Sequence, residues 1–210
     1  MSHPTHSDSK SLRVLEAATR VFLEHGFNAA TTDMIQRAAG VSKATVYSRY
    51  PTKDALFAEV IAYQCGAFTQ RVQSIEIVPG NIRKVLQEIG RTYLGLLLSP
   101  ESLALYRVVV AEAAKFPHLA RTFYLSGPET MKQILMRHLE QAAATGEIQV
   151  QSVGLESAAI LFMSMLRGEG QLIALTHPQS QASDVQIDQW VNNAVTTFLR
   201  AYGAGDTEAF

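Results

Sequence analysis

Apolar residues recur at helical spacing along almost the whole chain, and alternating strand patterns are nearly absent. Residues 148–153 alternate briefly, but they follow Gly146 and lead into another helical pattern, so we interpret them as a connector. Helices that have no sheet to cover must bury their apolar faces against one another. The sequence therefore predicts an all-α fold, a bundle of helices with short connections.

Start and stop signals divide this pattern into separate helices. Gly26 and Gly40 are expected to end the first two helices, and Pro51 the third, because a residue before proline resists the helical conformation. The predicted helices span residues 9–25, 32–39, 42–50, 53–74, 82–98, 101–115, 116–127, 128–146, 154–175 and 184–202. We expect residues 1–8 and 204–210 to be tails, with the first one disordered.

Side chains at the predicted helix starts support this division. Thr32, Ser42 and Thr52 are expected to be N-caps, because a hydroxyl there can accept a hydrogen bond from the first turn. Pro117 and Pro128 are expected at first helical positions, where the missing N–H is not needed.

The second and third predicted helices form a helix-turn-helix layout. Val46 and Tyr50 lie four residues apart and share the buried face of the third helix. The remaining residues of that helix point outward, where a major groove of DNA can receive them. The residues predicted to contact DNA are Thr32, Lys43, Ala44, Thr45, Tyr47, Ser48, Arg49 and Lys53.

The chemistry of these side chains suits DNA. Lysine and arginine donate to guanine O6 and N7, and small residues such as Ala44 let the helix approach the bases. Tyr47 and Ser48 can reach phosphates, while Thr32 and Lys53 are expected to hold backbone oxygens from helix starts. Residues 28–53 carry a surplus of three positive charges, although the whole chain has a net charge of −1. Non-specific attraction alone would therefore be weak.

The stretch TTDMIQRAAGVSKATVYSRYPTKDALFAEV resembles the DNA-binding domain of the TetR family of bacterial transcriptional regulators, and the resemblance covers residues 12–60. Residues 111–129 are similar to the C-terminal domain of AefR-like members. The resemblance implies a DNA-binding domain at 9–56, and a ligand-binding and dimerisation domain at 57–203. It also implies a cytoplasmic homodimer on a palindromic operator, a repressor released by a small effector. Gln36 stands where the family usually has a small residue, so we expect it to bend outward or reach a phosphate.

Two groups of residues in the C-terminal part are expected to serve the effector and the dimer. Aromatic, Met and aliphatic residues at helical spacing are more often plain core, but in this family such a bundle encloses a pocket. The predicted pocket, for an apolar or amphipathic molecule, comprises Tyr63, Phe68, Tyr93, Leu97, Tyr106, Val109, Phe123, Phe162, Met163 and Leu166. The predicted dimer interface comprises Ala158, Met165, Ile187, Trp190, Val191, Ala194 and Phe198, because residues 158–166 are apolar on nearly every side.

Other function classes find little support in the sequence. The six histidines show no H-E-x-x-H spacing, and no Ser, Cys and His arrangement indicates nucleophilic catalysis, so we expect no enzyme, metal or cofactor. The single cysteine, Cys65, suits a reducing compartment, and we interpret it as a small buried residue. The longest uncharged apolar run is far shorter than the roughly 20 residues that cross a bilayer. A helical protein–protein adaptor and a helical-bundle enzyme remain the alternatives.

Overall fold

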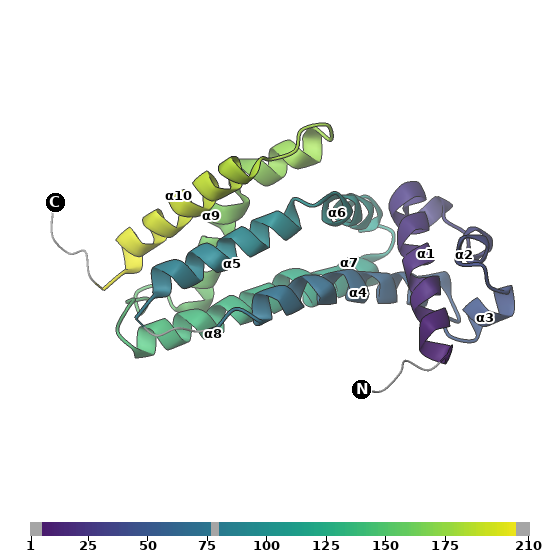
Figure 1. The fold of residues 1–210 in the computed structure, drawn as a ribbon, viewed down its shortest axis with the longest axis horizontal. Helices are drawn as coiled ribbons and strands as arrows, with labels where there is room; N and C mark the ends of the chain where they lie inside the picture. Colours follow the sequence, from purple (N-terminus) through teal and green to yellow (C-terminus); the bar gives the residue numbers. More distant parts are fainter. Residues whose placement is uncertain (1–5, 77–79, 205–210) are drawn as a thin grey trace. The chain divides into compact units, whose positions relative to one another are not determined.

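The chain folds into helices that belong to two compact units. The computed structural model describes the backbone of residues 6–76 and 80–204, and their side chains except those of residues 6–9, 67 and 68. Within these ranges the only β contact is an isolated bridge between Ile148 and Gly203, which confirms the all-α class. The first unit comprises Met1–Ala67 and Pro100–Gly127, and the second comprises Phe68–Ser99 and Pro128–Phe210 (Figure 1).

The first unit is built around helix α1, which packs against both α2 and α6. Its centre is a cluster of phenylalanine rings whose centroids lie 4.7–5.8 Å apart: Phe22, Phe27, Phe57 and Phe116. The elements of this unit are α1 (His6–Ala29), α2 (Thr32–Ala39), α3 (Lys43–Tyr47), most of α4 (Lys53–Gln73), α6 (Pro100–Glu112), α7 (Pro117–Tyr124) and the first residues of a π-helical turn, η1 (Leu125–Glu129).

Helix α1 differs from its prediction at its start and agrees with it at its end. It begins at His6, so residues 6–8 belong to a helix and not to the predicted tail, while residues 1–5 lie outside the described part. Gly26 has φ 75° and ψ 165°, a conformation that favours glycine and interrupts the helix before a last turn that reaches Ala29. The predicted stop signal is thereby confirmed.

The second unit packs its helices around one apolar core. Helix α10 (Asp184–Tyr202) lies alongside α5 (Ile82–Leu97) and α9 (Leu155–Thr176), and α8 (Thr130–Ala144) packs against α9 (Figure 1). Phe162 and Phe198 meet edge to face near the middle, with ring centroids 5.3 Å apart. Helices approach closely here: a Cβ atom on Gly170 would lie 2.7 Å from the Trp190 ring, so a side chain at this position would require the ring to move.

The segment between α7 and α8 departs from the prediction. Pro128 was expected at the first position of a helix, but it lies inside η1, which continues directly into α8 at Thr130. Proline removes one backbone hydrogen bond, and in an α-helix its ring also clashes with the carbonyl four residues earlier, so Pro128 coincides with a departure from regular α-helical geometry. Residues 148–153 contain no helix or strand, as predicted for a connector.

The packing also bears on the predicted domain boundary after residue 56. Helices α6 and α7 belong to the first unit, together with the predicted helix-turn-helix segment. Which parts can fold on their own is not decided by packing, so the proposed division at residue 56 stays a prediction. Cys65 is buried in the first unit as expected, and burial raises the pKa of its thiol to about 12.

Helix α9 is long and apolar enough to cross a membrane by length and composition alone. Core helices of soluble proteins meet the same criterion, and α9 supplies Ala158, Phe162 and Leu166 to the core of the second unit. Gly168, with φ 34° and ψ −142°, also breaks its regular helical conformation. The burial of these side chains shows that α9 packs within the helical bundle of the second unit.

Glu147 holds the start of α5 in the second unit. Its carboxylate accepts hydrogen bonds from the backbone N–H groups of Gly80 at 2.9 Å and Ile82 at 2.8 Å, and from the Thr145 hydroxyl at 2.9 Å. Partial burial works to raise the pKa of this carboxyl, but the three hydrogen bonds outweigh it and lower the pKa below 4.5. Glu147 thus replaces the missing side-chain cap of Asn81.

We predict that Glu147→Gln lowers the free energy of unfolding by about 1 kcal/mol at pH 7, the usual value of a helix cap. The folded-state pKa of Glu147 is depressed, so its stabilisation is present above about pH 4.5 and disappears as the pH falls through the folded value. Urea unfolding between pH 3 and pH 7 should show the two proteins converge at the acidic end. Glu140→Gln, at an exposed position on α8, is the control. A constant difference at every pH would contradict this role.

Candidate nucleic-acid interface

The turn between α2 and α3 is fixed by two caps and one glycine. Thr31 has extended backbone angles, and its hydroxyl accepts a hydrogen bond from the N–H of Met34. Thr31 is therefore the N-cap of α2, and the prediction that Thr32 has this role is wrong. Gly40 ends α2 in the left-handed conformation at φ 62°, and the Ser42 hydroxyl caps α3 by accepting from the Thr45 N–H, both as expected.

Helix α3 is shorter than predicted and is held by its buried face. It spans only Lys43–Tyr47, and the following residues form a tighter turn in which the Arg49 N–H donates to the carbonyl of Val46. Val46 is fully buried and Tyr50 is half-buried. Of the residues predicted to contact DNA from this helix and turn, Thr45 is half-buried and the others are exposed: Lys43, Ala44, Tyr47, Ser48 and Arg49.

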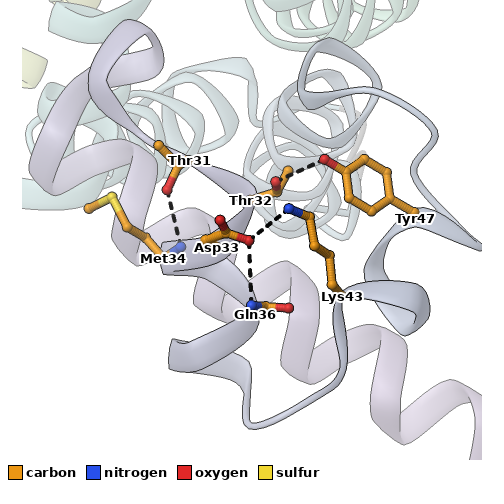
Figure 2. A network of polar contacts seen from close by, with 7 residues as sticks. All are labelled: Thr31, Thr32, Asp33, Met34, Gln36, Lys43 and Tyr47. Atoms are coloured by element: carbon orange, nitrogen blue, oxygen red, sulfur yellow. Dashed lines mark hydrogen bonds and ion pairs between the residues drawn. The ribbon is translucent and has the colours of Figure 1, made fainter.

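A polar network joins this exposed face to the start of α2. The Lys43 Nζ lies 3.0 Å from an oxygen of Asp33, and the hydroxyls of Thr32 and Tyr47 lie 3.0 Å apart (Figure 2). Gln36 also donates to Asp33 on the same helix, at 3.4 Å, and its expected contact with a phosphate stays a prediction. Figure 2 shows these side chains converging from α2 and α3.

This network keeps the lysine charged and positions it. The hydrogen bond to Asp33 and the attraction of that carboxylate raise the pKa of Lys43. Such an exposed ion pair is weak in water, so a stronger acceptor can replace the carboxylate. The pairing of Asp33 with Lys43 depends on how α2 and α3 pack against each other, which the spacing of the two residues in the sequence does not reveal.

Lys53 does not fit the phosphate contact predicted for it. Its Nζ donates to the carbonyl oxygens of Phe27 at 2.8 Å, Asn28 at 3.1 Å and Ala30 at 3.1 Å. An ammonium group has three N–H donors, and all three are used. The Nζ also lies 4.6 Å from the centre of the Phe27 ring. The geometry therefore assigns Lys53 to holding the end of α1, with its charge near carbonyl groups that carry partial negative charge.

The residues predicted to form the effector pocket are divided between the two units. In the first unit, Val109 is buried and Tyr63 is exposed. The rings of Tyr106 and Phe123 meet edge to face there, with their centroids 6.1 Å apart. The core of the second unit contains Tyr93, Phe162, Met163 and Leu166, with Leu97 packed against it. The side chain of Phe68 lies outside the described part. That these residues line one pocket stays a prediction.

The residues predicted at the dimer interface lie at different depths in the second unit. Four of them are at most 4% exposed within a single chain: Ala158, Val191, Ala194 and Phe198. These four are core residues that have almost no surface to offer a partner. Met165, Ile187 and Trp190 are half-buried. The outer face of α9 instead exposes Ile160, Leu161 and Leu172, which sequence spacing alone did not separate from the buried face.

In the described ranges, no group of His, Cys, Asp or Glu side chains is arranged to hold a metal ion. The aromatic contacts, caps and ion pairs of the first unit instead position the exposed face of α3. What this arrangement offers chemically is one exposed helix face with donors, a small residue and an aromatic hydroxyl.

We predict that Lys53→Met lowers the free energy of unfolding by about 1–3 kcal/mol, because three carbonyl groups lose their partner while the apolar stem is kept. Lys43→Met, which removes only an exposed ion pair, is the matched control and should unfold almost like the parent. Urea unfolding monitored by circular dichroism measures both. Equal stability of the two variants would contradict the role assigned to Lys53.

Comparison with known proteins identifies both parts of the chain. The family profile described as "Bacterial regulatory proteins, tetR family" matches residues 14–60. The profile described as "AefR-like transcriptional repressor, C-terminal domain" matches residues 84–204, more than half of the chain. The chain is also 29% identical over 195 residues to YvkB of Bacillus subtilis (strain 168), an uncharacterised HTH-type transcriptional regulator, covering 91% of this chain and 96% of YvkB.

Solved structures agree with these matches. A protein of Mesorhizobium loti MAFF303099 assigned to the TetR family of transcriptional regulators superposes with a TM-score of 0.86 at 26% identity, over 95% of this chain and all of the other. The flavonoid-responsive regulator FrrA superposes with a TM-score of 0.78 at 33% identity, over 96% of this chain and 99% of FrrA. With its capped helix-turn-helix and these matches along its length, the chain belongs to the TetR family of bacterial transcriptional regulators.

Proposed function

We propose that this DNA-binding regulator is a repressor, which binds a palindromic operator as a homodimer and leaves it when a small apolar or amphipathic effector binds. The proposal places its action in the cytoplasm, where the operator DNA is. It rests on the exposed face of α3, where Lys43, Ala44, Tyr47, Ser48 and Arg49 lie outside while Val46 anchors the helix from within. An adaptor or an enzyme has no use for such a face at a capped helix-turn-helix.

The proposed contacts assign different tasks to these side chains. Lys43 leaves Asp33 and donates to a guanine edge, since an exposed ion pair is easily exchanged for a stronger acceptor. Tyr47 and Thr32 exchange their mutual hydrogen bond for phosphate oxygens, which fix the register of the helix. Ala44 leaves room for a close approach to the bases. Lys53 supports these groups from within the unit and makes no contact with DNA.

We predict that Lys43→Ala weakens operator binding about 10-fold and relaxes the preference at one operator position. The operator is sought as an inverted repeat upstream of the protein's own gene, and affinity is measured by fluorescence anisotropy at several salt concentrations. Lys84→Ala, an exposed lysine on α5, controls for the loss of one positive charge. If Lys43→Ala and Tyr47→Phe both bind the operator as tightly as the parent, the exposed face of α3 does not recognise the operator.

The outer face of α9 supports the homodimer. Ile160 and Leu161, before the break at Gly168, are 45% and 44% exposed, and Leu172, after the break, is 62% exposed. Large apolar side chains left in solvent often mark interfaces, and a two-fold axis pairs the same surface of both copies. Such symmetry sets two α3 helices about one DNA turn apart, roughly 34–36 Å.

We predict that Leu161→Asp converts the dimer to a monomer at micromolar concentration, because it places two carboxylates in an apolar contact. Sedimentation velocity measures the change, and circular dichroism should show an unchanged helix content. Substituting Phe198 is unsuitable, since its ring is fully buried in the core and its loss would unfold the unit. Glu140→Gln is a surface control. A parent that sediments only as a monomer would overturn the proposal.

The effector proposal rests on the composition of the second unit. Its core is apolar and aromatic, which suits an apolar or amphipathic molecule. FrrA, at 33% identity, is described as flavonoid-responsive, so hydroxylated flavones are the first ligands to test. Helix α4 runs from the first unit into the second, so it is the proposed link between effector and DNA. Release requires the effector to prefer the DNA-incompetent state.

We predict reciprocal weakening: a flavone that lowers operator affinity 5- to 150-fold, the range of a typical coupling of about 1–3 kcal/mol, must itself bind more weakly to the operator complex by the same factor. Calorimetry with and without operator DNA measures both. Equal ligand affinity in the two titrations would show that the ligand does not act through DNA release.

A further inference from the structure

His138 is a polar residue in the apolar interior of the second unit. It is 5% exposed, and it lies on the face of α8 that also carries the core residues Met131, Ile134, Leu135, Leu139 and Ala142. Its Nδ1 atom has no hydrogen-bond partner among the described residues, and it is the one buried side-chain nitrogen or oxygen atom there in that condition. The helix caps and ion pairs described above do not explain why this nitrogen is buried.

An unpaired buried nitrogen is unfavourable, because it has given up its hydrogen bonds to water and gained none in return. Burial, followed by the nearby charge of Arg137, lowers the pKa of His138 below 6.5, so the ring is neutral at pH 7. A neutral imidazole has one nitrogen that donates and one that accepts. A group that can either donate or accept is therefore the best partner for Nδ1.

We propose that Nδ1 of His138 hydrogen-bonds a hydroxyl group of the effector, which fixes the orientation of an otherwise apolar molecule in the second unit. The inference rests on the proposed function and narrows the effector to a hydroxylated amphipathic compound. A hydroxyl fits either tautomer of the ring. A carboxylate or an ammonium group is disfavoured, because it would bring a net charge into an apolar core. Ligand sites commonly combine apolar walls with a few such polar groups.

Nothing in the sequence distinguishes His138 from the other histidines. It lies in a helix whose apolar pattern also fits plain core. Only the burial of its ring without a partner for Nδ1 separates it from a histidine that serves the fold alone. A natural protein that retains an unpaired buried group is often exchanging stability for function.

The test combines two variants with matched ligands. The full-length parent, His138→Leu and His138→Gln are titrated with 5-, 7- and 4′-hydroxyflavone and with their methyl ethers by calorimetry. We expect at least one hydroxyflavone to bind the parent about 10-fold more tightly than its ether. His138→Leu, of similar volume, should bind both members of that pair equally, and His138→Gln should keep part of the preference. This double comparison isolates the contact between hydroxyl and ring.

Stability and DNA binding provide the controls. His138→Leu should melt at the same temperature as the parent or higher, because it removes the unpaired atom, and it should bind operator DNA like the parent without ligand. A melting temperature several degrees lower would show that His138 serves the fold. An unchanged hydroxyl preference in His138→Leu, as expected if Nδ1 holds only a water molecule, would overturn the inference. The absence of flavone binding to the parent would also overturn the inference. If the parent still bound operator DNA in that case, its DNA-binding function would be unaffected by this result.

Discussion

The ammonium group of Lys53 holds the chain in place between the end of α1 and the start of α2. It binds the carbonyl oxygens of Phe27, Asn28 and Ala30, the last residues before the Thr31 cap of α2. Carbonyls at a helix end lack partners within the helix, and a cation satisfies them best. The Phe27 ring beneath it belongs to the aromatic cluster of the first unit. One side chain of α4 thus joins the end of α1, the start of α2 and the core.

The outward side chains of α3 are held in place by contacts that are easily broken. Helix α3 has only five residues, too few to be stable alone, so it depends on the Ser42 cap and on the burial of Val46. Its outward side chains are paired with α2 by one exposed ion pair and one hydroxyl contact. Such contacts hold the side chains in place only weakly, and under the proposed function they are exchanged for contacts with bases and phosphates.

The second unit follows a different principle, close packing with very few polar groups inside. Glycine at 90 and 170 lets helices approach until side chains touch the backbone, with Trp190 lying directly on Gly170. At its edge, Glu147 caps α5 with a carboxylate from the segment after α8. In such an interior the unpaired nitrogen of His138 is exceptional, because nearly every other buried group is either apolar or bonded. The same packing leaves Ile160, Leu161 and Leu172 of α9 exposed within the single chain.

The sequence by itself determined the all-α class, the breaks at Gly26 and Gly40, the Ser42 cap and the inward side of Val46. These features depend on residues a few positions apart, whose conformational preferences are local. Tertiary structure decided what depends on distant residues. It moved the α2 cap to Thr31, placed Lys53 on carbonyls more than twenty residues away, paired Lys43 with Asp33, and buried Phe198 while exposing Leu161. Helical periodicity marks an apolar face but not what covers it, because that depends on how the helices pack in space.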